Sequence, residues 1–493
     1  MQTQRTETEP SQTTPAGPEA SGAIARRAAP GARGVDLTSG SIWKHLIAFS
    51  MPMLAGSLLQ TSYNIINAVW VGKYLGNEAL AAVTVCFPPL FLMMAMANGL
   101  GMAASVMASQ AYGAKDDSGV RVIVDTGVAL TIGLSIVCLV AGHEGAESLL
   151  RLMGTAPDVL PLAVPYLRLL SFTVPVMFGL FLLTALLRGV GDSKTPLWFQ
   201  TGSVIATIVL DPVLIFGLAG APRMGLNGTA VATLVTQIGA LIALGLYLRA
   251  RRHIAMPGRG LLTPSIAVGW RLLKIGVPSM IQQGLVSFGM VVLVSLVNGF
   301  GRDVTAAFGA GMRIDQLAFM PAMSIGTAVS SIAGQNIGAR LFDRVDQAFR
   351  AGVAMCLVSG GLAAAVALLL PETVMRAFLS DRASIEIGCE YLRITSIGYL
   401  LFSVMFVSNG VINGAGDTMA TTFFSLLGLW IIRLPIAVAL SRAWHHQKGI
   451  WWAVVVSFGA AMTVSLLYYR SGRWKRVLKN AMPAAQPQVD SPG

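Results

Sequence analysis

The sequence predicts an all-α polytopic membrane protein with twelve transmembrane helices, arranged as two six-helix lobes related by a tandem, parallel repeat. Composition is the first reason: of 493 residues, 54% are hydrophobic and only 12% are charged, whereas charged residues make up about a quarter of soluble domains. The second reason is a series of twelve apolar runs between Leu46 and Tyr469, each of about the 20 residues that cross a bilayer. The third is a set of motifs that recur 225 positions apart.

Two pairs of motifs carry the repeat. The segments GMAASVMASQAYGA at Gly101–Ala114 and GTAVSSIAGQNIGA at Gly326–Ala339 share Gly, Gln and Gly-Ala at equivalent positions. The segments RGVGDSKTP at Arg188–Pro196 and NGAGDTM at Asn413–Met419 share G-x-G-D at the same offset. Because each lobe has an even number of spans, both lobes begin on the same side of the membrane, as in parallel-repeat transporters. We therefore expect two lobes that face each other across a cavity.

The predicted organisation has five segments. Residues 1–42, rich in Pro, Thr, Ala and Gly, are expected to form a disordered cytoplasmic tail, not a signal peptide, because no apolar block precedes a cleavage site. Residues 43–250 form the N-lobe with spans one to six, and residues 271–470 form the C-lobe with spans seven to twelve. The basic residues 251–270, broken by Pro and Gly, link the lobes in the cytoplasm. Residues 471–493 form a second cytoplasmic tail.

The net charge of +12 is interpreted as a sign of membrane topology. When the N-terminus is placed inside, most Lys and Arg residues fall in inner loops and tails, including RARRH at Arg249–His253 and RSGRWKR at Arg470–Arg476. This asymmetry follows the positive-inside rule. Both termini are therefore expected in the cytoplasm, and the basic residues are expected to contact membrane lipid and no nucleic acid.

The repeated G-x-G-D motif has a catalytic and a structural interpretation. Some intramembrane aspartyl proteases carry this pattern around a catalytic aspartate. Here both copies fall in predicted cytoplasmic loops, and a single active site needs no second copy. We expect the glycines to form tight turns and Asp192 and Asp417 to cap the following helices. The chain also lacks the Tyr-Asp pair that such a protease would carry, so no enzyme is predicted.

The cysteines predict neither disulfides nor a metal centre. They are widely spaced, inside or beside apolar runs, and are interpreted as small core residues: Cys86, Cys138, Cys356 and Cys389. The sequence therefore predicts no cofactor and no resident metal, apart from a coupling ion.

Asp211 is the acidic residue that lies deepest within an apolar run. An ionised aspartate at mid-bilayer costs about 3 kcal/mol on insertion scales, so a functional role is the first hypothesis. Thr207 lies four residues earlier on the same helical face. Pro212 leaves the carbonyl of Ile208 without its helical partner. Together these residues predict a small polar site in the outer half of the membrane.

The first span presents a polar face that we expect to look into the cavity. Gln60, Tyr63, Asn64 and Asn67 recur at steps of three and four residues, so their side chains share one direction. The other predicted cavity residues are Met93, Met96, Gln282 and Gln283. Two alternatives remain open: the amides could only hold helices together, and the methionines could only fill the core.

The chain resembles the multidrug and toxic compound extrusion (MATE) family across residues 43–470. The resemblance lies in NAVWVGKYLG, QAYGA, GQNIGA, ALLRGVGDSKTP, LDPVLIFG, MGLNGTAVAT and NGAGDT. It implies a secondary active transporter of the bacterial cytoplasmic (inner) membrane. By alternating access, such a protein exchanges cationic or amphipathic organic compounds for H⁺ or Na⁺. The alternative within the same superfamily is a lipid-linked oligosaccharide flippase. Because two internal lobes already build a cavity, we expect a monomer.

The resemblance also implies roles for individual residues. Asp211 matches the acid of span five in the family, and Thr233 matches a span-six threonine near the ion site of the first lobe. Asn67 stands where the family often has Asp, and Thr207 stands where it usually has Asn. The acids that one branch uses in spans seven and ten are absent, which favours the DNA-damage-inducible-like branch with coupling in the first lobe.

Overall fold

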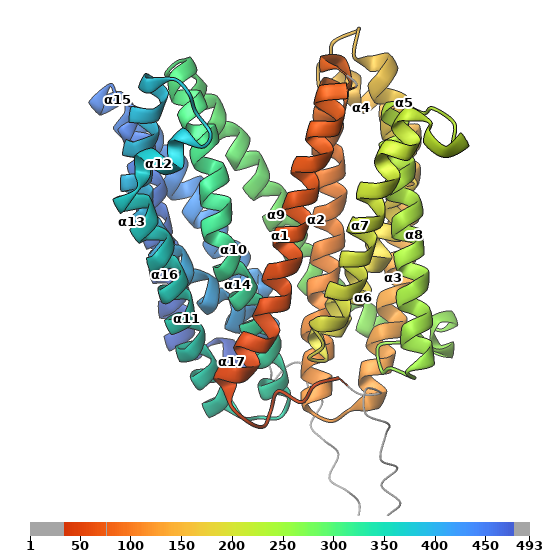
Figure 1. Ribbon diagram of the computed structural model, residues 1–493. Helices are drawn as coiled ribbons and strands as arrows, with labels where there is room; N and C mark the ends of the chain where they lie inside the picture. Colours follow the sequence, from red (N-terminus) through yellow and green to blue (C-terminus); the bar gives the residue numbers. More distant parts are fainter. Residues whose placement is uncertain (1–33, 75, 478–493) are drawn as a thin grey trace, which may run out of the picture.

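A computed structural model describes residues 34–74 and 76–477, and all regular secondary structure in these residues is helical (Figure 1). Eleven helices are long and apolar enough to cross a membrane, and a pair bent by 44° forms a twelfth span. The predicted fold class is therefore confirmed.

The N-lobe contains six spans and the C-lobe repeats them. The N-lobe spans are α1 (Ile42–Tyr74), α2 (Asn77–Gly113), α3 (Asp117–Glu144), the bent pair α5 (Leu160–Ser171) and α6 (Thr173–Gly189), α7 (Lys194–Phe216) and α8 (Leu226–Ala250). The C-lobe spans are α9 (Ile266–Asn298), α10 (Arg302–Gly338), α11 (Phe342–Leu369), α13 (Arg382–Gly414), α14 (Thr418–Leu426) continued by the π-helical η3 (Leu427–Arg433) and α15 (Leu434–Trp444), and α16 (Lys448–Arg470).

Short helices occupy the connections between spans. They are α4 (Ala146–Leu152), η1 (Leu218–Gly220), η2 (Arg259–Leu262), α12 (Pro371–Arg376) and α17 (Trp474–Val477). Even these follow the repeat, since α12 begins 225 positions after α4, as α10 ends 225 positions after α2.

The two lobes meet at one end of the molecule. In Figure 1 the two bundles approach each other at the lower end, where α1 begins and α17 lies, and diverge toward the upper end. The helices that contact each other across the lobes are chiefly α1 and α2 of the N-lobe and α9 and α10 of the C-lobe. The basic loops at the lower end, including residues 249–252, make it the predicted cytoplasmic side.

The G-x-G-D loops have the structural role that the sequence predicts. Gly191 has φ +89° and Gly416 has φ +88°, a region that only glycine adopts freely. Asp192 accepts hydrogen bonds from the amides of Lys194 at 3.1 Å and Thr195 at 3.0 Å, in the first turn of α7. Asp417 accepts from the Ala420 amide at 3.4 Å at the start of α14. Both aspartates therefore cap helices.

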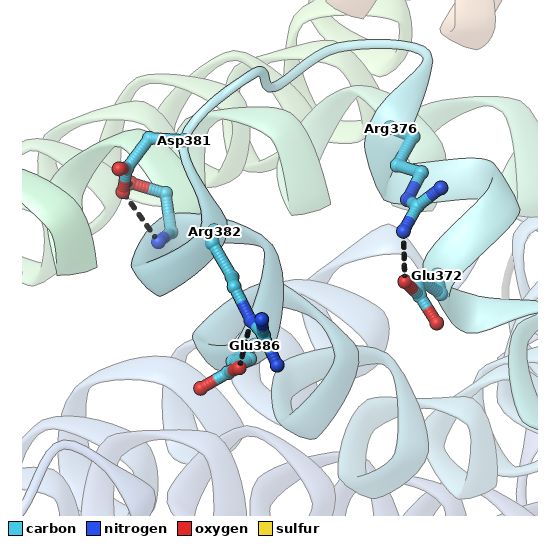
Figure 2. Close-up of polar contacts among 6 residues, drawn as sticks. Glu372, Arg376, Asp381, Arg382 and Glu386 are labelled. Atoms are coloured by element: carbon cyan, nitrogen blue, oxygen red, sulfur yellow. Dashed lines mark hydrogen bonds and ion pairs between the residues drawn. The ribbon is translucent and has the colours of Figure 1, made fainter.

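Exposed ion pairs lie at the opposite, upper end of the molecule. Figure 2 shows Glu372 bound to Arg376 and Glu386 bound to Arg382, each one helical turn apart. Asp381 caps α13 through the Ser384 amide at 3.0 Å, and this hydrogen bond lowers the pKa of the carboxyl. Exposed pairs of this kind stabilise a fold by at most about 1 kcal/mol.

The predicted tail at residues 1–42 has two parts. Residues 1–33 lie outside the described residues, as do residues 478–493 of the second tail. Residues 34–41, in contrast, pack against the helices, and Leu37 is only 1% exposed. Side chains of α2 and α10 form hydrogen bonds with the backbone of Gly34 and Leu37. The division of the chain into tails, lobes and linker stays a prediction.

Asp192→Ala is expected to remove the cap of α7 without removing function. The loss of an N-terminal cap destabilises a helix by about 1 kcal/mol. Thermal unfolding in detergent should therefore show a lower midpoint, while transport in liposomes persists. Complete loss of activity in a folded Asp192→Ala, Asp417→Ala double variant would instead support the catalytic interpretation of G-x-G-D.

Candidate functional site

Asp211 is buried in α7 with neither carboxylate oxygen hydrogen-bonded to any described residue. Asp211 is only 1% exposed, and neither Oδ1 nor Oδ2 has a hydrogen-bond partner among the described residues. Buried polar groups are nearly always paired, so each exception needs an explanation. The sequence prediction that Asp211 is buried within a span is confirmed by its position in α7.

Two contacts between α7 and α8 lie on either side of Asp211 along α7. Toward the helix start, the hydroxyls of Thr207 and Thr236 share a hydrogen bond of 2.7 Å. Toward the helix end, Gly228 lies so close to the α7 backbone that a Cβ there would be 2.8 Å from the carbonyl carbon of Leu214. These contacts hold the segment around Asp211 tightly against α8.

Helix α1 supplies the third wall of the site. The hydroxyls of Tyr63 and Thr233 share a hydrogen bond of 3.4 Å, which joins α1 to α8. Asn67 donates to the Tyr63 hydroxyl at 3.0 Å. Tyr63 is also close enough to interact electrostatically with Asp211. The structure therefore brings Asn67, Tyr63 and Thr233 into one network beside Asp211.

Three polar residues on or against α8 were not predicted. Thr236 pairs with Thr207, and the Tyr166 hydroxyl of α5 accepts a hydrogen bond from Thr229 at 3.5 Å. The signal was present in part, because Thr229, Thr233 and Thr236 recur at helical spacing along α8. Tyr166 has no such signal, since the bent pair α5 and α6 brings it in from a distant part of the chain.

The remaining amides of the predicted cavity are not part of this network. Gln60 donates to Asn64 at 3.4 Å, one turn along α1, and the Asn64 side chain is exposed. Gln282 donates to Ser425 of α14 at 2.5 Å, so it joins two helices of the C-lobe. Gln283 is exposed. Whether Gln60, Asn64 and Gln283 touch substrate stays a prediction.

The two predicted cavity methionines lie in or beside one hydrophobic cluster. Met93 is buried in a hydrophobic cluster with Ala97, Cys138 and Phe178, and Met96 packs against the same cluster. This cluster lies between α2, α3 and α6, inside the N-lobe. This packing agrees with the alternative that the methionines fill the core, and whether Met93 and Met96 also line a substrate cavity stays a prediction.

A second intramembrane aspartate, Asp315 of α10, is fully paired. It accepts hydrogen bonds from Tyr391 at 2.5 Å and from Tyr399 at 2.7 Å, both on α13. Arg433 lies near enough to act on it electrostatically and donates to Ser457 at 2.8 Å. Asp315 and Arg433 thus belong to one polar cluster within the C-lobe.

Comparison with known proteins identifies the family. The sequence profile of the MatE family matches residues 52–213 and again residues 278–439, one match for each lobe. The chain belongs to the MatE family. The resemblance to MATE transporters that the motifs indicated is thereby confirmed, and with it the expectation that the protein is a transporter and not an enzyme. The assignment to one branch of the MATE family stays a prediction.

Relatives of similar length support this assignment. Probable multidrug resistance protein YoeA of Bacillus subtilis (strain 168) is 34% identical over 446 residues, which cover 88% of this chain and 95% of that protein. Probable multidrug resistance protein YpnP of the same organism is 35% identical over 440 residues, 89% of this chain and 97% of that protein. The crystal structure of MATE in complex with MaL6 matches with a TM-score of 0.84 and 25% identity, covering 90% of this chain and 99% of that chain.

Tyr399→Phe is expected to destabilise this MATE protein without changing its coupling. The substitution leaves Oδ1 of Asp315 without its donor, and an unpaired buried polar group costs about 1–3 kcal/mol. The thermal unfolding midpoint should fall, whereas Tyr247→Phe, at an exposed tyrosine, should leave it unchanged. If Tyr399→Phe left stability unchanged but abolished ion coupling, the coupling site would have to be placed in the C-lobe instead.

Proposed function

We propose that the protein is a secondary active exporter of cationic or amphipathic organic compounds, and that Asp211 is the carboxylate that couples export to an ion gradient. One observation carries this proposal. Asp211 is the aspartate that is almost fully buried within a span and has no hydrogen-bond partner among the described residues. The names of the Bacillus relatives support drugs as the class of substrate.

The physical basis is the cost of a lone charge in a medium of low dielectric constant. An ionised carboxylate without partners is unfavourable there, so a proton or a cation that neutralises it binds favourably. Asp211 can hold only one such neutralising partner at a time. Exchange of an entering ion for a leaving organic cation follows when the lobes expose the site alternately to the two sides.

The hydrogen bonds around Asp211 favour H⁺ over Na⁺ as the coupling ion. A sodium ion needs several oxygen ligands, whereas a proton needs one carboxylate oxygen. The Thr207 hydroxyl is already bound to Thr236, and the Thr233 hydroxyl is already bound to Tyr63. Binding of Na⁺ would require these hydroxyl oxygens to turn a further lone pair toward the ion, whereas binding of H⁺ requires no change in either pair. Each charge that crosses the membrane gains about 2.3 kcal/mol per 100 mV, which drives uphill export.

We further propose a monomer in a bacterial cytoplasmic membrane, with both termini in the cytoplasm. The distribution of basic residues supports the orientation, and the two lobes of a single chain support the oligomeric state, because they already provide both halves of a transport pathway. Bacterial relatives that match nearly the whole chain support the location.

Asp211→Asn is expected to abolish ion-coupled export while the protein still folds and inserts. The amide keeps the size of the side chain but cannot take up a proton or balance a cation. Liposomes with an imposed pH gradient and a fluorescent cationic dye would measure export. The matched control is Asp315→Asn, a second intramembrane aspartate, which should retain gradient-driven export even if it unfolds at lower temperature.

Export at the normal rate by folded Asp211→Asn would reject the proposal. A panel with an imposed Na⁺ gradient in place of the pH gradient identifies the ion. Labelled lipid in the same liposomes tests the flippase alternative, since flipping of lipid without export of dye would favour that alternative.

Asn67→Ala is expected to weaken coupling less than Asp211→Asn does. Asn67 forms a hydrogen bond with Tyr63, whereas Asp211 has no partner among the described residues, so the loss of Asn67 removes one hydrogen bond of about 1 kcal/mol from the surrounding network. The apparent affinity for the coupling ion should change by less than about tenfold, measured as export rate against pH. A loss as complete as that of Asp211→Asn would show that Asn67 contacts the ion directly.

A further inference from the structure

Two glutamines that the repeat relates join the lobes at the end where they meet. Gln110 of α2 donates to the carbonyl of Gly414, the last residue of α13, at 2.8 Å. Gln335 of α10 donates to the carbonyl of Gly189, the last residue of α6, at 3.1 Å. Both glutamines and both glycines are 225 positions apart. Each glutamine therefore satisfies a helix-end carbonyl of the opposite lobe.

The helices that carry these glutamines are in backbone contact. A Cβ at Gly113 would lie 1.9 Å from the carbonyl oxygen of Gln335, and a Cβ at Gly338 would lie 2.0 Å from that of Gln110. The glycines of QAYGA and GQNIGA thus allow α2 and α10 to pack this closely. The repeated motifs, which the ion site does not use, form the closed end of the molecule.

The segment from Gly34 to Gly40, here called the strap, crosses this closed end. On the C-lobe side, the Leu37 amide donates to Oε1 of Gln335 at 2.9 Å, and Asn336 donates to the Leu37 carbonyl at 3.2 Å. Arg344 donates to the Gly40 carbonyl at 3.1 Å. Leu37 itself is buried within a C-lobe hydrophobic cluster.

The strap also contacts the N-lobe. The Tyr112 hydroxyl of α2 donates to the Gly34 carbonyl at 2.7 Å. A Cβ at Gly191, in the first G-x-G-D loop, would lie 2.3 Å from the Val35 carbonyl oxygen, so the strap backbone rests directly on that loop. The strap is therefore attached to both lobes at once.

Gln335 is the point at which the strap and the interlobe contact come together. Its side-chain amide binds Gly189 of the N-lobe, and Val35 and Leu37 of the strap, and the residue is 0% exposed. Gln110 has no equivalent, because the corresponding part of the chain, around residues 258–265, docks on α3 through Asp125 and Thr126. The strap therefore breaks the symmetry of the repeat.

We propose that the strap is a lock on the closed end of the transporter and that Gln335 is the gating residue through which it acts. For the lobes to part at this end, Gln335 must release Gly189, and the strap must leave one lobe. The strap thus favours the conformation in which this end is closed. The inference uses the two-lobe architecture but not the coupling ion, so the role of the strap can be tested independently of the role of Asp211.

The test measures the distance between the lobes at this end without substrate or gradient. Spin labels are placed at Ser118 and Asp343, exposed positions that the repeat relates, in a background that lacks the four native cysteines. Pulsed electron paramagnetic resonance then reports the fractions of closed and open molecules. Leu37→Asp, which places a charge in the buried strap position, is expected to raise the ratio of open to closed by at least about fivefold, because the hydrophobic cluster around Leu37 offers that charge no partner.

A double-mutant comparison separates the strap from general loosening. Gln335→Ala is expected to raise the ratio too, and its combination with Leu37→Asp should raise it less than the product of the two single effects. Gln110→Ala is the matched control, because it removes the symmetry-related interlobe bond but no strap contact. Its effect should multiply with that of Leu37→Asp.

Two results would overturn the proposal. One is an unchanged distance distribution in folded Leu37→Asp. The other is an effect of Leu37→Asp that multiplies with that of Gln335→Ala as fully as with that of Gln110→Ala. If Leu37→Asp does not fold, Leu37→Ala replaces it; it should shift the ratio in the same direction by a smaller factor, and no shift would reject the lock.

Discussion

The absence of water from the bilayer core is the constraint on which the rest of this structure depends. Every polar group that enters the core must find its partner within the protein. The chain meets this demand almost everywhere: Asp315 takes two tyrosine hydroxyls, and the threonines of α8 bond to α7 and α1. Neither carboxylate oxygen of Asp211 has a hydrogen-bond partner among the described residues. Some neutral groups are also buried without a partner, among them Thr131, Gln237 and Thr422, but Asp211 is the carboxylate in this set. A carboxylate costs more to bury than a neutral group, so a partner that binds and dissociates explains it best.

Duplication gives the two lobes the same arrangement of helices. The polar residues that differ between the lobes decide what each lobe does. In the N-lobe an acid, Asp211, precedes Pro212 within span five, whereas the matching C-lobe span carries the basic Arg433 shortly before Pro435. A positive charge there does not attract a cation. The interlobe contacts, in contrast, are nearly symmetric, because they depend on glycines and glutamines that both copies retain. Ion binding is thus expected in one lobe, while both lobes build the closed end.

Sequence alone predicted what depends on local pattern. Apolar run length gave the spans, the constant offset gave the lobes, and the position of Asp192 in a loop gave its capping role, all of which the structure confirms. Prediction from sequence failed where contacts join distant parts of the chain. Nothing near Asp315 indicates that tyrosines 76 and 84 residues away will bind it. The composition of residues 34–41 gives no sign of the hydrogen bonds to Gly34, Leu37 and Gly40, because their partners lie far along the chain in α2, α10 and α11.

Two helices connect the ion site to the strap: α1, which begins at Ile42 shortly after the strap, and α7, which follows the Gly191 loop on which the strap rests. On α1, Tyr63 lies roughly 32 Å from Ile42 at 1.5 Å per residue. Over that distance a change of one charge at Asp211 has little direct electrostatic effect on the hydrogen bonds of Gln335. A signal between the two sites therefore has to be mechanical, carried by a displacement of α7 or of α1, which packs against α7 of one lobe and α10 of the other. Because α1 contacts both lobes, a shift of Tyr63 on ion binding affects the strap when it moves the start of α1 relative to Gln335.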